Sequence, residues 1–320
     1  MGDGPVGAAA VQRFPVDAVA VGPGDAPDWL VQSVRDGGAT VVPPGQADAL
    51  LWIHPDDPGG LAAVLRSHGG HLRWVQLPWA GVEPYVGVLD RERIWTCGKG
   101  VYAEPVAELA LTLVLAGLRG LPTYLHDAPL VERGTIGRNL RGADVVVVGA
   151  GGITDAFLRM VAPFDAITTV VRRRSEPHPG ARRTVTLDGL DDALRDADVV
   201  VVACALTPAT TGLFDARRFA RMQQHAWLVN VARGALVVTD DLLEALRAGT
   251  IGGAGLDVTD PEPLPPDHPL WAETNCVITP HVGNTADMGR PLLAERIRSN
   301  VARRIAGAPL LGPVDVDAGY

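Results

Sequence analysis

The sequence predicts an α/β protein built on two parallel sheets, and three features of the chain support this prediction. Short apolar segments alternate with helical ones along residues 16–100, and the alternation starts again at residue 144. The strand segments are nearly uninterrupted apolar runs, which is typical of strands covered by helices on both faces. The length of 320 residues suits two domains of roughly 100–200 residues each.

The first alternating region contains five predicted strands and two predicted helices. The strands are expected at residues 16–21, 40–42, 49–54, 72–77 and 93–97, and the helices at 26–36 and 60–67. A further helix is expected from Glu104 to Gly117, with Pro105 in its first turn. Because this helix is apolar on nearly every face, we expect it to be buried between layers or domains. The charged, turn-rich segment 121–140 is expected to form an exposed arm.

The second alternating region is longer and ends near His281. Strands are expected at residues 144–148, 166–171, 199–204, 227–231, 253–258 and 276–279, and helices at 153–162, 187–195, 215–224 and 240–248. Thr239 is expected to cap the last of these helices. A final helix, with apolar residues from Met288 to Ile305 at helical spacing, is expected to return to the first domain. That domain then comprises residues 1–103 and 286–320, and the second domain residues 104–285.

Composition excludes several classes of protein. A formal net charge of −9 argues against non-specific nucleic-acid binding, which needs a basic face. The three cysteines form no CxxC pair and no metal-ligand spacing, so we expect no metal site and a reducing environment. The N-terminus lacks the pattern of a signal peptide, and no apolar run approaches the ~18 residues that span a bilayer. A cytoplasmic protein without a membrane partner is expected.

A glycine-rich loop at residues 148–154 has the context of a dinucleotide-binding turn. It follows a strand of four valines and opens a helix, and Gly149, Gly151 and Gly152 allow a tight turn near a pyrophosphate. Thr154 stands where a third glycine would serve close helix–strand packing. A glycine-rich turn in a domain that binds no nucleotide is the alternative.

The next strand bears on the choice between NAD and NADP. No acidic residue follows it to bind a ribose 2′-hydroxyl, and Arg172, Arg173, Arg174 and Ser175 stand there instead. Because guanidinium groups bind phosphate in a bidentate manner, we expect a preference for NADP over NAD. An exposed basic turn without function is the alternative.

Three chemically distinctive residues, Arg233, Glu262 and His281, each follow a predicted buried strand. The ends of neighbouring parallel strands face one crevice, so these residues can meet over one small substrate. Reduction of a 2-keto acid needs a cation for the carboxylate and carbonyl, and an acid for the oxygen. Arg233 suits the first role and His281 the second, with Glu262 orienting the imidazole and favouring its protonated form. Alternatively, Arg233 is a surface or cap residue, His281 is structural and Glu262 is a rigid turn residue.

The chain also resembles the D-isomer-specific 2-hydroxyacid dehydrogenase family, which includes glyoxylate/hydroxypyruvate reductases and phosphoglycerate dehydrogenase. The resemblance rests on motifs in the family's order and spacing over roughly residues 70–285. They are LTPATTGL at 206–213, NVARG at 230–234, AGLDV at 254–258, EPLP at 262–265, HPLW at 268–271 and TPH at 279–281. The resemblance implies two Rossmann-like doubly wound domains, the first discontinuous, with the active site in the cleft between them. It further implies a homodimer formed through the cofactor domain.

The resemblance also implies roles for individual residues. It assigns catalysis to Arg233, Glu262 and His281, and substrate binding to Arg233, Trp79 and the backbone N–H groups of Ala80 and Gly81. Together with the glycine-rich loop and the basic turn, the resemblance leads us to expect cofactor contacts at Gly149, Gly151, Gly152, Ile153, Arg172, Arg173, Cys204, Ala205, Thr210, Val231, Ala232, Arg233, Asp257, His281 and Gly283. Asp257 is expected near the nicotinamide amide.

Departures from the family pattern leave the substrate open. Thr154 and Arg172 replace the usual glycine and acid, and Leu109 stands where the family often has histidine. Trp79 is larger than the usual residue and either shapes the substrate pocket or packs in the core. The leading hypothesis is reversible NAD(P)H-dependent reduction of a small 2-keto acid to the D-2-hydroxy acid. The alternative is a nucleotide-sensing scaffold of the same fold, similar to corepressors that resemble these dehydrogenases.

Overall fold

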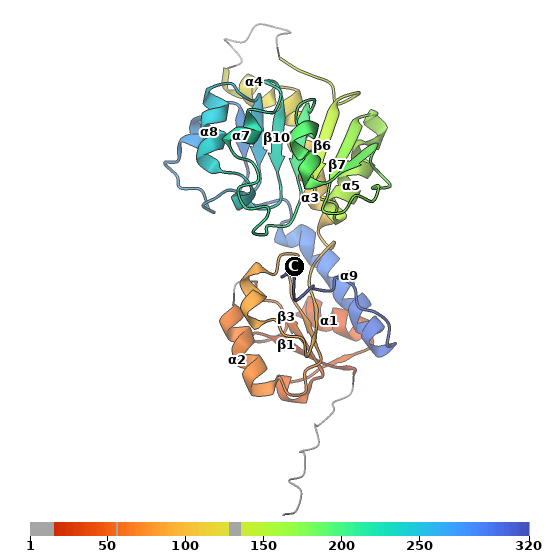
Figure 1. The fold of residues 1–320 in the computed structure, drawn as a ribbon. Helices are drawn as coiled ribbons and strands as arrows, with labels where there is room; N and C mark the ends of the chain where they lie inside the picture. Colours follow the sequence, from red (N-terminus) through yellow and green to blue (C-terminus); the bar gives the residue numbers. More distant parts are fainter. Residues whose placement is uncertain (1–15, 56, 128–135, 320) are drawn as a thin grey trace, which may run out of the picture. The chain divides into compact units, whose positions relative to one another are not determined.

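A computed structural model describes residues 16–55, 57–127 and 136–319. The chain divides into two compact units (Figure 1). The first is formed by the described parts of Met1–Val101 and Ala286–Tyr320, and the second by those of Tyr102–Thr285. Each unit contains its own parallel sheet, so the two parallel α/β layers predicted from the sequence are confirmed.

The first unit is a five-stranded parallel sheet in the order β2-β1-β3-β4-β5. This is the flavodoxin-like doubly wound order. The strands are β1 (Ala18–Gly22), β2 (Thr40–Val41), β3 (Ala49–Trp52), β4 (Trp74–Gln76) and β5 (Ile94–Thr96). The helices are α1 (Asp28–Asp36), α2 (Pro58–His68) and α9 (Ala286–Ile305), with 3₁₀ turns η1 (Pro44–Gln46) and η2 (Glu83–Val88).

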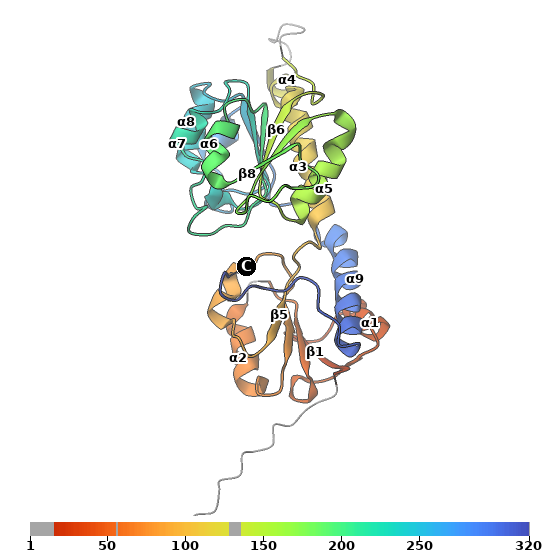
Figure 2. The same cartoon turned by 45° about the vertical axis from the view of Figure 1, so that its right-hand side comes forward.

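Successive strand residues of this unit point to opposite faces of its sheet, because the side-chain period of a strand is two residues. Leu50 and Trp52 join Leu61 of α2 on one face. Leu51 joins Leu30 of α1 and Ile297 of α9 on the other face. Figure 2 shows α1 and α9 on one side of this sheet and α2 on the other. The last helix therefore completes the core that the first strands began.

The second unit is a seven-stranded parallel sheet in the order β12-β11-β10-β9-β6-β7-β8. Read from β8, this is the Rossmann order 3-2-1-4-5-6 with β12 added at the end. The strands are β6 (Asp144–Val148), β7 (Ile167–Val171), β8 (Arg183–Val185), β9 (Val199–Val202), β10 (Trp227–Asn230), β11 (Gly253–Leu256) and β12 (Cys276–Ile278). The predicted doubly wound architecture is thus confirmed for both units.

Six helices and four 3₁₀ turns accompany this sheet among the described residues of the unit. The helices are α3 (Ala103–Leu118), α4 (Leu121–Asp127), α5 (Gly152–Val161), α6 (Leu190–Ala193), α7 (Ala216–Phe219) and α8 (Thr239–Arg247). The 3₁₀ turns are η3 (Ala162–Phe164), η4 (Leu187–Gly189), η5 (Gly234–Leu236) and η6 (Pro269–Ala272). In Figure 2, α6, α7 and α8 cover one face of the sheet, and α3 and α5 cover the other.

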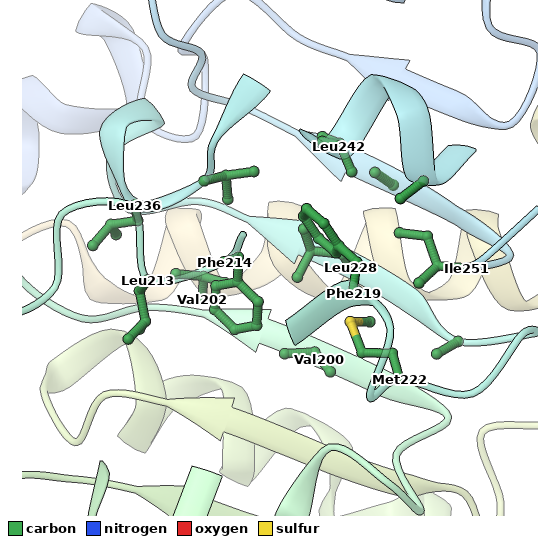
Figure 3. Packing of buried hydrophobic residues seen from close by; sticks show 14 of the residues in the cluster. Val200, Val202, Leu213, Phe214, Phe219, Met222, Leu228, Leu236, Leu242 and Ile251 are labelled. Carbon is green, nitrogen blue, oxygen red and sulfur yellow. The ribbon is translucent and has the colours of Figure 1, made fainter. Parts of the chain in front are cut away.

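The valine-rich strands of the second unit explain why both faces are covered. Val200 and Val202 of β9 contribute to a cluster with Phe219 and Leu242 from the helices α7 and α8 (Figure 3). Val199 and Val201 lie in the opposite cluster, beneath α3 and α5. A strand that is apolar at every position buries all of its side chains only between two helical layers.

Some predicted boundaries were wrong. Thr239 does not cap α8: it is the first residue of the helix, and its hydroxyl donates to Asp260 O at 2.6 Å. The strand predicted to reach residue 258 ends at Leu256, because Asp257 turns toward a neighbouring loop. The arm predicted for 121–140 begins with the helix α4, and its residues 128–135 lie outside the described part of the chain.

Two helical predictions also needed correction. The helix predicted at 215–224 covers only Ala216–Phe219, with the Asp215 side chain capping it by accepting from Arg218 N–H. The very apolar α3 is buried on one side, while Glu108 and Thr112 face outward. Among the described residues, no helix combines the length and apolar character that crossing a bilayer requires.

Candidate active site and dinucleotide site

The carboxyl ends of β10, β11 and β12 meet at one edge of the second sheet, because these three strands are adjacent and parallel. Arg233, Glu262 and His281 follow these ends. Two of the three are in direct contact: His281 Nδ1 lies 2.6 Å from Glu262 Oε1. Both side chains are about half exposed, at 52% and 40%. Because Nδ1 is engaged by the carboxylate, the other ring nitrogen, Nε2, is the atom available for proton exchange.

The loop that carries His281 is held by a single buried carboxylate. Asp257 is 2% exposed, and its Oδ1 accepts from Thr279 Oγ1 at 2.6 Å and from Val282 N at 2.8 Å. Its Oδ2 accepts from Gly283 N at 2.8 Å, and its backbone oxygen accepts from His281 N at 2.9 Å. His281 has a φ of +53°, which is uncommon for a residue other than glycine. The bonds to Asp257 offset this backbone strain and set the direction of the imidazole.

A buried asparagine shapes the turn that presents Arg233. Asn230 ends β10, and its amide donates to Arg233 O at 2.9 Å while accepting from Ala232 N at 3.1 Å. Gly234 follows, and a Cβ there would lie 1.8 Å from Thr259 O. Only glycine therefore lets this turn pack against the segment that leads to Glu262. The guanidinium of Arg233 is half-buried and donates through Nη1 to Ala232 O at 2.7 Å.

The glycine-rich loop has the shape that its sequence predicts. Gly149 has a φ of +123°, and a Cβ there would lie 2.3 Å from Ala203 O. Thr154, at the position of the missing third glycine, is fully buried, and its hydroxyl donates to Gly149 O at 3.1 Å. The threonine thus packs α5 close to the strand and also ties the turn together.

The open side of this loop fits a dinucleotide. Gly151 is the N-cap of α5 and provides no side-chain cap for the first-turn N–H groups of Gly152 and Ile153. A Cβ at Gly151 would meet nothing within 4 Å, so the backbone borders open space. This space lies at the positive end of the helix dipole, where a pyrophosphate binds favourably. The residues present therefore suit an NAD(P) cofactor, whose reduced form would supply a hydride when bound.

Two further segments border the cofactor loop. Arg172 follows β7, next to β6 in the sheet, and Gly149 N donates to Val171 O at 2.8 Å. The basic turn therefore starts beside the glycine-rich loop. Arg172 is half-buried, whereas Arg173 and Arg174 are exposed.

The segment after β9 also lies at this edge of the sheet. Thr210 Oγ1 donates to Ala205 O at 2.8 Å and closes the loop that follows Cys204. Burial raises the pKa of the Cys204 thiol to about 11, so this residue is a neutral packing group at physiological pH. Contacts of Cys204, Ala205 and Thr210 with a cofactor remain a prediction.

The predicted substrate loop lies in the first unit, directly after β4. Trp79 is 42% exposed, so the alternative that it packs in the core is wrong. Trp79 O accepts from Gly98 N at 2.7 Å, and Ala80 O accepts from Cys97 Sγ at 3.5 Å. Within the described residues, the N–H groups of Ala80 and Gly81 donate to no protein acceptor. Binding of a carboxylate by these groups remains a prediction.

Sequence reasoning missed two residues that shape the site, Asn230 and Thr279, and it missed the tethering role of Asp257. Each is a small polar residue directly after or at the end of a strand, where its side chain can hydrogen-bond nearby backbone groups. That placement was the available signal for Asn230. The pairing of Thr279 with Asp257 has no local signal, because 22 positions separate the two residues.

Comparisons with known proteins found a matching family and similar solved structures. A sequence model described as D-isomer specific 2-hydroxyacid dehydrogenase, NAD binding domain, matches residues 111–283. A glyoxylate reductase/hydroxypyruvate reductase of Mus musculus is 34% identical over 256 residues, covering 76% of this chain and 77% of that protein.

Two solved structures are also similar. A D-isomer specific 2-hydroxyacid dehydrogenase from Xanthobacter autotrophicus Py2, in complex with NADPH and MES, aligns with a TM-score of 0.82 and 28% identity, covering 95% of this chain and 99% of that one. An NADPH-dependent glyoxylate/hydroxypyruvate reductase from Sinorhizobium meliloti, in complex with NADP and sulfate, aligns with a TM-score of 0.78 and 26% identity, covering 95% and 100%.

Proposed function

Because the chain belongs to the D-isomer specific 2-hydroxyacid dehydrogenase family, we propose that it reduces a small 2-keto acid of the glyoxylate or hydroxypyruvate type to the D-2-hydroxy acid. Membership makes it an NAD(P)-dependent oxidoreductase. The observation that carries the finer proposal is the 2.6 Å contact between His281 Nδ1 and Glu262 Oε1. Reversible proton transfer to a carbonyl oxygen requires an imidazole with one accessible nitrogen, and pairing of the other nitrogen with a carboxylate orients the ring.

The roles of the three residues follow from their chemistry. His281 gives its Nε2 proton to the carbonyl oxygen during reduction and takes it back during oxidation. Glu262 stabilises the imidazolium and keeps its orientation. Arg233 binds the substrate carboxylate and polarises the neighbouring carbonyl, because its planar fork matches a carboxylate. A reduced nicotinamide cofactor, held by the glycine-rich loop at Gly149, Gly151 and Gly152, would supply the hydride for the carbonyl carbon.

The proposal extends to the other predicted contacts of substrate and cofactor. The N–H groups of Ala80 and Gly81 bind substrate oxygen atoms, supported by their lack of acceptors within the described residues. NADPH is the preferred cofactor, supported by Arg172 and Arg173 at the end of β7. Asp257 is additionally proposed as the nicotinamide contact, although three donors already occupy its carboxylate.

Turnover tests this function directly. We expect the purified protein to oxidise NADPH with glyoxylate or hydroxypyruvate, and to do so better than with pyruvate or phenylpyruvate. His281→Ala should lower kcat by about 100-fold to 10,000-fold and leave the Kd for NADPH nearly unchanged. Undiminished kcat in this variant refutes the acid role. Binding of NADPH without turnover of any keto acid would favour the nucleotide-sensing scaffold instead.

We also propose a cytoplasmic homodimer that assembles through the cofactor unit. The short helix α4 exposes Leu121 by 50% and Leu125 by 83%, and Ile136 nearby is 37% exposed. Such grouped apolar side chains are typical of an interaction surface. The three free cysteines suit a reducing compartment. Sedimentation should show a dimer that Leu125→Glu converts to monomers, and a monomeric wild-type protein overturns this assembly.

A further inference from the structure

A buried histidine joins the basic loop after β7 to the first turn of the cofactor helix α5. His178 is 7% exposed, and its Nε2 lies 3.1 Å from Asp155 Oδ1. Its Nδ1 accepts from Gly180 N at 3.3 Å, and its backbone N–H donates to Thr184 Oγ1 at 2.8 Å. The proposed catalytic function uses none of these contacts.

The contacts of His178 determine which nitrogen of its imidazole carries the proton. A backbone N–H can only donate, so Nδ1 of His178 is the acceptor from Gly180. The ring proton then sits on Nε2, which donates to the carboxylate of Asp155. Both ring nitrogens have a partner, which is the condition for keeping a polar side chain buried. The ring therefore acts as a rigid joint between the loop and the helix.

His178 lies in the same loop as the three arginines that follow β7. Arg172, Arg173 and Arg174 occupy the start of the loop, and His178 occupies its middle. The three neighbouring guanidinium groups repel one another, so the loop needs an anchor to hold them together. The start of the loop is held by Arg172, whose N donates to Val185 O at 3.0 Å and whose Nη1 donates to Glu176 O at 3.4 Å, and the hydrogen bonds of His178 hold its middle.

Asp155 lies only a few residues after the glycines that border the dinucleotide space. It belongs to the first turn of α5, where its N–H donates to Gly151 O at 3.0 Å. Fixing His178 to this carboxylate therefore fixes the basic loop relative to the cofactor loop itself. A binding site that is already ordered loses less entropy when its ligand arrives, and so binds it more tightly.

We propose that His178 and Asp155 form a clamp that positions the arginines after β7 for the 2′-phosphate of NADPH. His178 is then a positioning residue for cofactor choice and touches neither cofactor nor substrate. This inference rests on the NADPH preference proposed above. It adds a cause for that preference at two residues outside the predicted phosphate contacts.

The test compares NADPH with NADH in variants of the clamp. His178→Ala should raise the KM for NADPH by about tenfold and the KM for NADH by less than about twofold, with kcat unchanged. Asp155→Ala breaks the same contact from a side chain that is 54% exposed, so its effect does not depend on a buried substitution. It should lower the ratio of kcat/KM with NADPH to kcat/KM with NADH as much as His178→Ala does.

Asp155→Asn is the matched control. It removes the same charge as Asp155→Ala but keeps an oxygen that accepts from His178 Nε2, so the preference should persist within about twofold. The clamp is refuted if Asp155→Ala and Asp155→Asn have equal ratios of kcat/KM with NADPH to kcat/KM with NADH. It is also refuted if His178→Ala keeps the wild-type ratio.

A separate variant distinguishes this failure from failure of the NADPH preference. Arg172→Gln combined with Arg173→Gln removes the proposed phosphate ligands themselves. If this double variant changes the ratio and the clamp variants do not, the clamp alone is refuted. If the double variant also leaves the ratio unchanged, the proposed 2′-phosphate site and the clamp that serves it are both refuted.

Discussion

Replacing Asp257 with asparagine should loosen the loop that holds His281. The carboxylate accepts from Thr279 Oγ1, Val282 N and Gly283 N at 2.6, 2.8 and 2.8 Å. An amide offers one oxygen, so at least one donor then faces an N–H group inside the protein. A buried donor left without an acceptor costs about 1–3 kcal/mol. Loss of the negative charge weakens the two remaining bonds by about 1 kcal/mol each.

The total for Asp257→Asn is about 3–5 kcal/mol, and burial of the side chain at 2% exposure means that solvent does not screen it. For a unit of this size, each kcal/mol lowers Tm by about 2–4 °C. We therefore expect calorimetry without cofactor to show a Tm lower by about 6–20 °C. Released from its tether, His281 should also lose alignment, with kcat lower by about 100-fold.

Two substitutions at Thr279 provide the controls for this prediction. Thr279→Ser keeps the hydroxyl that donates to Asp257 and should behave nearly as wild type. Thr279→Val removes only this bond and should cost about 1 kcal/mol. If Asp257→Asn melts within about 2 °C of the wild-type protein, the carboxylate does not hold the loop and the reasoning fails.

Three further predictions concern catalysis, cofactor binding and stability. Glu262→Gln keeps a group near His281 but removes the charge that stabilises imidazolium, so kcat should fall about tenfold or more while the KM for NADPH stays constant. Gly151→Ala should leave the Tm without cofactor unchanged and weaken NADPH binding in a fluorescence titration. Gly149→Ala should lower that Tm, because a Cβ at Gly149 meets protein atoms and one at Gly151 does not. Equal effects of the two variants on Tm would contradict this. Burial raises the pKa of Cys276 from 9.0 to about 12, so the folded state keeps a proton that the unfolded chain releases, and stability should fall as pH rises from 9 to 12. With rising pH, the free energy of unfolding measured in urea should fall about 1.4 kcal/mol per pH unit less steeply in Cys276→Val. Identical pH dependence in the two proteins would show that folding does not raise the pKa of this thiol.

The two α/β layers and the candidate chemistry could be inferred from sequence because the relevant signals are local. The valine runs of β6 and β9 require a sheet covered on both faces, and glycines at a strand–helix junction require a tight turn. Arg233, Glu262 and His281 stood out because each charged or titratable group follows an apolar run that predicts a buried strand. Parallel strand order alone then brings the ends of β10, β11 and β12 to one edge.

Helix and strand ends were less predictable because distant residues compete for the same backbone groups. The Thr239 hydroxyl had a local use as a helix cap, yet it donates to Asp260 O, 21 positions away in sequence. The predicted end of β11 likewise moved because Asp257 bonds to the loop after β12. Neither partner lies within the sequence windows from which caps and strands are inferred.

The sequence on its own therefore carried the fold class, the cofactor loop and the three residues proposed for catalysis. Tertiary structure alone decided how they are held: Asp257 beneath the His281 loop, Asn230 within the Arg233 turn, and His178 between the basic loop and α5. The physical reason is the range of the interactions involved. Hydrophobic periodicity and turn chemistry act between neighbours in the chain, whereas a buried hydrogen bond forms only after folding has brought its donor and acceptor together.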